Sequence, residues 1–81
     1  MFPRRNFVGR GVTSTEIGKA IRSARKAQGL RQDDLAGLAG VGTRFVIEVE
    51  RGKETAQLGR VLHLLAVLGC DLTLSLPGAR K

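Results

Sequence analysis

One stretch of the sequence, RQDDLAGLAGVGTRFVIEVERGK at residues 31–53, constrains the fold more than any other. Apolar residues recur at helical spacing in each half of it, and between the halves Gly40 can adopt the left-handed conformation that ends a helix. Gly52 can end the second half in the same way. The residues expected to face inward are Leu35, Ala36, Ala39, Val46 and Val49. Two short helices joined by a glycine-containing turn predict a helix-turn-helix.

A further helix is expected on each side of this motif. Thr13 and Glu16 have the spacing of a capping box, so a first helix is predicted from Thr13 to Gly29. A last helix is predicted between Thr55, as its N-cap, and Gly69. Its main apolar face is expected to contain Leu58, Val61, Leu62, Leu65 and Leu68, and a second apolar stripe Leu64 and Val67. A helix that is apolar around more than half of its circumference needs more cover than a monomer provides.

The segment CDLTLSL at residues 70–76 alternates apolar and polar residues as a half-buried β-strand does. A single strand leaves its backbone unpaired, and the simplest partner is the same strand of a second copy, placed antiparallel by a two-fold axis. The residues expected to form the dimer interface are Leu64, Val67, Leu72, Leu74 and Leu76. The predicted organisation is a flexible basic arm at 1–12, a helix-turn-helix domain at 13–69, a dimerising strand at 70–76 and a short tail at 77–81.

Composition limits the kind of partner. Fourteen Lys and Arg against seven Asp and Glu give a formal net charge of +7, which favours a polyanion such as nucleic acid. One cysteine and one histidine offer little to a metal site, so neither a metal nor another cofactor is expected. No apolar run approaches the roughly 20 residues that span a bilayer, so no membrane partner and a cytoplasmic location are expected. The chain offers no acid–base pair or activated nucleophile, which argues against an enzyme.

The ordered set of motif residues resembles the lambda-repressor-like (XRE) family of helix-turn-helix DNA-binding proteins. The residues that carry the resemblance are Gln32, Leu35, Ala36, Ala39, Gly40, Val41, Val46, Val49, Glu50, Arg51 and Gly52. AGVGTRF, ERGK and QLGRVLHLLAVLG, followed by the alternating strand, resemble more narrowly the Hip-type (HipB-like) antitoxin branch. The resemblance covers residues 14–76 and implies a mainly α fold of four helices, with a C-terminal β-strand that pairs with its twin across a two-fold dimer axis. It also implies binding to the promoter of its own operon and to a kinase-fold toxin.

Six residues are predicted to contact double-stranded DNA. On the exposed face of the second motif helix, Arg44 suits a guanine edge, Thr43 a base edge or a phosphate, and Ile47 a thymine methyl. Gln32 opens the first motif helix and is expected to hold a phosphate, a contact that the resemblance also implies. Arg51 and Lys53 are expected to contact phosphates.

Two further positions bear on this surface. The resemblance implies a structural ion pair between Arg25 and Glu50, from the first helix to the second motif helix. Glu48 is acidic on or near the DNA-facing helix, where it could accept from a cytosine amino group or merely repel phosphate. The residues leave both readings open.

The functional hypothesis is a dimeric, sequence-specific transcriptional repressor that reads an inverted repeat as two half-sites about one DNA turn apart. Toxin binding follows from the resemblance alone. Two alternatives stay open: a stand-alone regulator with no toxin, and a protein-binding module in which the helix-turn-helix is only a scaffold. A gene for a kinase-like protein immediately downstream would support the antitoxin reading, and its absence would favour a stand-alone regulator.

Overall fold

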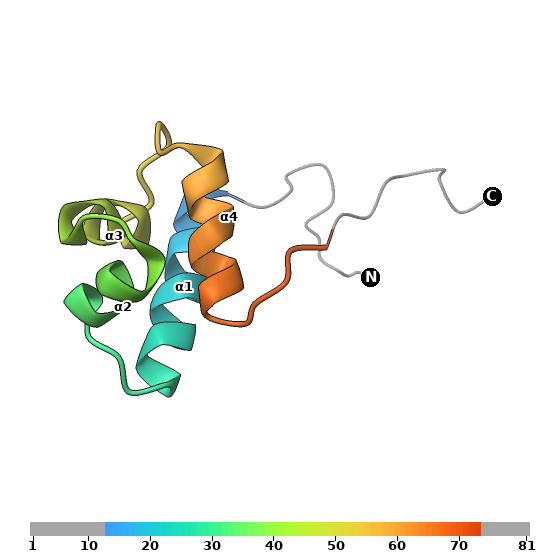
Figure 1. Cartoon of the computed structure of the whole chain (residues 1–81). Helices are drawn as coiled ribbons and strands as arrows, with labels where there is room; N and C mark the ends of the chain where they lie inside the picture. Colours follow the sequence, from blue (N-terminus) through green and yellow to red (C-terminus); the bar gives the residue numbers. More distant parts are fainter. Residues whose placement is uncertain (1–12, 74–81) are drawn as a thin grey trace.

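The computed structural model describes residues 13–73. This part of the chain contains four helices, α1 (Ser14–Ala27), α2 (Gln32–Ala39), α3 (Thr43–Glu50) and α4 (Leu58–Val67) (Figure 1). Helix α2 packs against α3 and α4, and α1 packs against α3. The predicted four-helix, mainly α arrangement is confirmed. The expected arm at 1–12, the tail at 77–81, and Leu74 and Leu76 lie outside the described residues.

Local sequence patterns set where the first helices begin and end. The Thr13 hydroxyl accepts from the Glu16 N–H at 3.1 Å, and the Thr13 N–H donates to the Glu16 carboxylate at 3.2 Å. This is the predicted capping box, which satisfies two backbone groups that the start of a helix would otherwise leave unpaired. Helix α2 begins differently, because the Asp34 carboxylate accepts from the Arg31 N–H at 2.9 Å. Gly40, at φ +70°, ends α2 in the expected left-handed conformation.

One apolar core holds the four helices together. Its buried members are Ile21, Leu35, Ala36, Ala39, Val46, Val49, Val61, Leu64, Leu65 and Leu68. All five residues expected to face inward from the helix-turn-helix stretch belong to it. Such burial stabilises a chain in rough proportion to the apolar area removed from water.

Helix α4 departs from the expectation in its start and in its orientation. It begins at Leu58 behind Gln57, whose side chain makes no capping hydrogen bond, and not behind Thr55. Leu64, assigned above to the dimer interface, is fully buried within the chain's own core, so that assignment is wrong. Leu62, expected on the main apolar face, is instead 41% exposed. The helix is rotated from the expected orientation because core packing selects one of several apolar faces.

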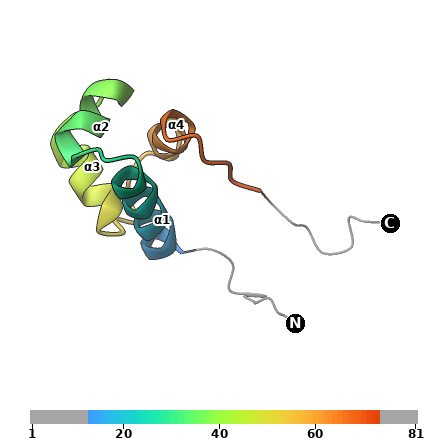
Figure 2. The same ribbon diagram turned by 90° about the horizontal axis from the view of Figure 1, so that it is seen from below.

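The chain leaves α4 through Gly69, at φ +76°, and the Cys70 N–H donates to the Leu65 carbonyl at 2.8 Å. Residues 70–73 form neither helix nor strand, and residues 74–76 lie outside the described part. A strand needs a pairing partner for its backbone groups, so a segment that pairs only with a second copy would not be a strand in one chain. Figure 2 shows residues 70–73 leaving the domain on the side away from α2 and α3.

None of the helices in residues 13–73 is both long enough and apolar enough to cross a membrane. Within the same residues, His, Cys, Asp and Glu side chains do not gather in groups of three or more that could hold a metal ion.

Candidate nucleic-acid interface

Helix α3 turns one face into the core and leaves the other outside. Val46 and Val49 are buried, Ile47 is half-buried, and Thr43 and Arg44 at the N-terminal end are exposed. Because side chains three and four residues apart share a helix face, Thr43, Arg44 and Ile47 lie close together on the outer surface. The structure therefore places three of the predicted DNA contacts on one accessible patch.

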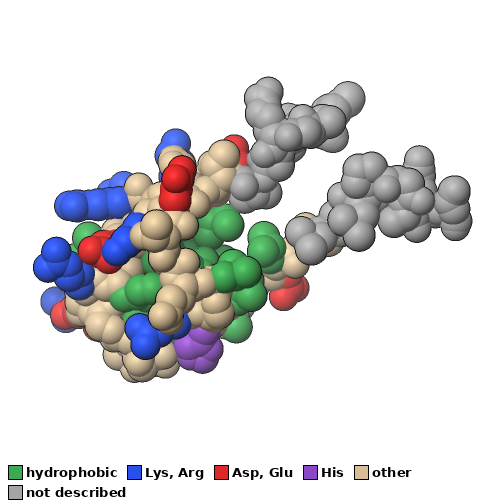
Figure 3. All heavy atoms as spheres, turned by 90° about the horizontal axis from the view of Figure 1, so that it is seen from above, with side chains coloured by type: hydrophobic (Ala, Val, Ile, Leu, Met, Phe, Trp, Pro, Cys, Tyr) green, Lys and Arg blue, Asp and Glu red, His purple; other side chains and the backbone are tan. Residues whose placement is uncertain are grey.

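Basic side chains gather around this patch. The Arg44 side chain is 89% exposed, and Arg51 and Lys53, directly after α3, are exposed as well. Figure 3 shows Lys and Arg side chains crowding the end of the molecule opposite the C-terminal exit. A cluster of cations on one side of a small domain attracts the phosphate backbone of nucleic acid.

Glu48 lies among these cations. Its carboxylate accepts from Lys53 Nζ at 3.0 Å and from Arg44 Nε at 3.4 Å. The hydrogen bond from Lys53, followed by that from Arg44, lowers the pKa of Glu48, so the carboxylate is ionised at neutral pH. Two of the predicted DNA contacts thus share one anionic neighbour in the free protein.

A buried ion pair joins α1 to the C-terminal end of α3. Arg25 Nε donates to Glu50 Oε2 at 2.7 Å and Nη2 donates to Glu50 Oε1 at 3.0 Å, with side chains only 8% and 3% exposed. Arg25 Nη1 donates to the Leu30 carbonyl at 2.9 Å, and the hydrogen bond to Glu50 raises the pKa of Arg25. The ion pair that the resemblance implied is present, and it is bidentate.

Gln32 belongs to the same network, a link that sequence reasoning missed. Its Nε2 donates to Glu50 Oε1 at 3.1 Å, which ties the start of α2 to the end of α3. An amide nitrogen carries two N–H groups, so one remains available for an outside acceptor such as a phosphate oxygen. No spacing rule connects residues 32 and 50, because the contact depends on how the two helices cross.

A second missed contact holds α3 to α4. The Arg60 guanidinium lies over the Phe45 ring, 5.8 Å from its centroid, and Phe45 is half-buried against the core. A cation over an aromatic face at this distance is attracted by the ring. The contact places a basic side chain of α4 near Phe45, in the first turn of α3.

The arrangement of α2, the Gly40 turn and α3 corresponds to a known family. A model described as helix-turn-helix matches residues 21–74, two thirds of the chain. The chain belongs to this helix-turn-helix family. Its resemblance to XRE-type and HipB-like proteins is thereby confirmed at the level of the family and the fold.

Two relatives add detail. An uncharacterized HTH-type transcriptional regulator, y4mF, of Sinorhizobium fredii (strain NBRC 101917 / NGR234) is 52% identical over 69 residues, which are 85% of this chain and 91% of the relative. The solved HipB-O4 20mer complex contains a chain with a similar fold, at a TM-score of 0.73 and 21% identity, over 82% of this chain and 93% of that one. In this helix-turn-helix protein, α2 and α3 are the two motif helices.

Proposed function

We propose that the protein is a dimeric, sequence-specific DNA-binding transcriptional repressor, and that it is the antitoxin of a Hip-type toxin–antitoxin pair. The observation that carries the DNA-binding part is the exposed N-terminal end of α3, where Thr43 and Arg44 project from the helix-turn-helix. In this family of motifs the N-terminal residues of the second helix reach base edges in the major groove. The likeness to a regulator and to HipB supports the same role.

Each residue of the interface has a proposed contact. Arg44 donates to the O6 and N7 atoms of a guanine, Thr43 contacts a base edge or phosphate, and Ile47 meets a thymine methyl. Gln32, held by Glu50, donates its second N–H to a phosphate. The remaining phosphate contacts are Arg51 and Lys53.

The dimer is proposed from exposed apolar residues on and after α4. Leu58, Leu62 and Leu72 are 64%, 41% and 45% exposed, and Val67 is half-buried. Pairing of residues 70–76 with the same segment of a second copy would bring Leu72, Leu74 and Leu76 together and cover this surface. Two α3 helices related by the two-fold axis would then read an inverted repeat.

The antitoxin part rests on the likeness to HipB and on the resemblance of the sequence to the Hip-type branch. It predicts binding to the promoter of the protein's own operon and to a kinase-fold toxin. The relative from Sinorhizobium fredii is named only as a transcriptional regulator, which favours a stand-alone regulator as the second candidate. Copurification with the product of an adjacent kinase-like gene would distinguish the two.

Fluorescence anisotropy tests the DNA-binding part. A labelled duplex from the gene's own upstream region is compared with a scrambled duplex across a salt series. We expect preference for the upstream duplex, and we expect Arg44→Ala to reduce that preference by about 1–3 kcal/mol because a bidentate guanine contact is lost. Arg22→Ala is the matched control, because Arg22 is an exposed arginine on α1.

Arg22→Ala should weaken binding to both duplexes slightly and equally, because it removes a positive charge but no base contact. Equal binding of both duplexes by the wild type, with equal salt dependence, would contradict the proposal. The protein would then be a basic module, and a protein partner would become the primary candidate.

A further inference from the structure

The proposed contacts leave Glu48 without a role, although it occupies the exposed face of α3. It follows Arg44 by four residues, about one helical turn, and its side chain is 32% exposed. An acidic residue at this place opposes binding to a polyanion, because it repels phosphates. We therefore asked which group in the major groove the Glu48 carboxylate could bind favourably.

The two oxygens of Glu48 have different partners. Oε1 accepts from Lys53 Nζ at 3.0 Å, and Oε2 faces Arg44 Nε at 3.4 Å. Because Nε is the inner nitrogen of the guanidinium, this contact leaves the two outer nitrogens of Arg44 free to donate elsewhere. The carboxylate thus lies directly beside the group that is proposed to read guanine.

Base chemistry limits what such a carboxylate can meet in the major groove. Ionised Glu48 only accepts hydrogen bonds, whereas phosphate oxygens, guanine O6 and N7, and thymine O4 are acceptors too. The exocyclic amino groups, N4 of cytosine and N6 of adenine, are the donors that the groove offers. Every base pair has one such amino group, on its cytosine or its adenine, so the orientation of the base pair decides whether the carboxylate meets that donor or the acceptors of the paired guanine or thymine.

We propose that Glu48 is a specificity-determining residue that accepts a hydrogen bond from a cytosine or adenine amino group next to the guanine read by Arg44. Where a guanine or thymine faces the carboxylate in place of that base, Glu48 meets only acceptors and weakens binding, so it suppresses attachment to unrelated sequences. This inference rests on the proposed DNA-binding function and on the contacts of Glu48 with Arg44 and Lys53.

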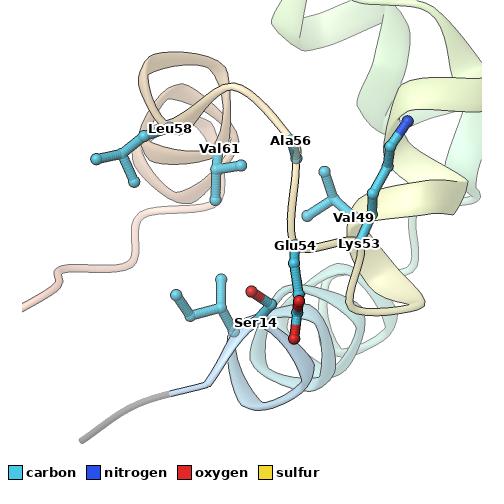
Figure 4. Close-up of a pocket in the computed structure, with 8 residues that line it drawn as sticks. Ser14, Val49, Lys53, Glu54, Ala56, Leu58 and Val61 are labelled. Atoms are coloured by element: carbon cyan, nitrogen blue, oxygen red, sulfur yellow. The ribbon is translucent and has the colours of Figure 1, made fainter.

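Selection from a pool of randomised duplexes tests the proposal, with wild type, Glu48→Ala and Glu54→Ala compared. Glu54→Ala is the matched control because it removes the same charge from an exposed residue outside α3. Figure 4 shows Glu54 beside Ser14, in the pocket between α1 and the start of α4. Circular dichroism checks that both variants keep the helical fold.

We expect the wild type to enrich half-sites with a guanine next to a fixed cytosine or adenine, and the enriched base identifies the donor. The duplexes enriched by Glu48→Ala should keep the guanine, while the base preference at the neighbouring position falls by at least about fivefold. Binding of a scrambled duplex, measured by anisotropy, should tighten in Glu48→Ala more than in Glu54→Ala.

Identical enriched sequences for wild type and Glu48→Ala would overturn the inference and leave the proposed function intact. The inference would also be overturned if both variants bound the scrambled duplex more tightly to the same extent and neither lost base preference at any position. The effect would then be one of net charge alone. A wild type that enriches no sequence would overturn the proposed function and this inference together.

Discussion

Arg25 is a buried charged residue, and neighbours from three elements accept or share its hydrogen bonds. Glu50 accepts two of its hydrogen bonds, the Leu30 carbonyl accepts a third, and Gln32 donates to the same carboxylate. A buried charge is tolerated when it is paired and fully hydrogen-bonded. The network joins α1, α2 and α3 at one point, which fixes the outer face of α3 relative to the start of α2.

Removing one member of this pair should be costly. We expect Glu50→Ala to lower the free energy of unfolding by about 3–5 kcal/mol, because it leaves the Arg25 guanidinium buried without its counter-charge. Urea denaturation followed by circular dichroism measures the change. Glu54→Ala, an exposed acidic residue, should change stability by no more than about 0.5 kcal/mol.

A double variant distinguishes the stabilisation by the ion pair from the cost of leaving one charge buried without its partner. Replacing Arg25 and Glu50 together by apolar residues should cost less than either single change, because no unpaired charge is left in the core. Strictly additive losses would contradict this account of the pair.

At the scale of elements, α1 and α3 pack closely because α1 carries a glycine at their contact. A Cβ built on Gly18 would overlap the Val49 carbonyl oxygen and lie 2.8 Å from the Glu50 carbonyl oxygen. Both neighbours are backbone atoms at the end of α3, so they cannot give way without moving the helix. Gly18 therefore determines how closely α3 can approach α1.

Gly18→Ala and Gly37→Ala should have opposite effects. Gly18→Ala forces α3 away from α1 and should destabilise the protein by about 1–3 kcal/mol, the usual cost of overpacking. Gly37 lies on α2 with open space around it, so Gly37→Ala should stabilise by about 0.5–1 kcal/mol through better helix propensity. Thermal unfolding measures both, and equal shifts in the same direction would refute the steric explanation.

Local patterns predicted most of the helix boundaries, whereas contacts between helices did not follow from them, and the Arg25–Glu50 pair was expected from the resemblance alone. The Thr13 capping box and the left-handed Gly40 depend on neighbours within a few residues, so spacing alone reveals them. The buried face of α4 could not be predicted in this way, because apolar residues surround much of the helix. A rotation of the helix about its own axis moves Leu62 out of the core and Leu64 into it. Likewise, the bond from Gln32 to Glu50 exists only after α2 and α3 have packed.

At the scale of the whole molecule, charge and apolar surface lie on different sides. The cations around α3 gather at one end, whereas Figure 3 shows hydrophobic side chains exposed toward the C-terminal exit. Among residues 13–73, three of the four exposed large apolar residues, Leu58, Leu62 and Leu72, lie on α4 or after it. Such a concentration of exposed apolar residues is typical of a contact surface, which supports the proposed dimer.

Leu72→Asp tests this dimer. In a two-fold interface the change acts on both copies, so we expect the dimer dissociation constant to rise by at least about thirtyfold, equivalent to about 2 kcal/mol. Sedimentation velocity over a concentration series measures the mass. Leu38→Asp is the matched control, because Leu38 is 63% exposed but lies on α2. A wild type that remains monomeric, or equal dissociation by both variants, would argue against pairing through the C-terminal segment.

The turn at Gly69 has a consequence for how binding events can combine. It directs the chain away from α2 and α3, so a partner held by the C-terminal segment does not have to enter the space that a duplex would occupy at α3 (Figure 2). The C-terminal segment and the outer face of α3 are therefore separate surfaces of the described chain. Under the proposed function, such a molecule can serve as an adaptor between a duplex at α3 and a protein partner at its opposite side.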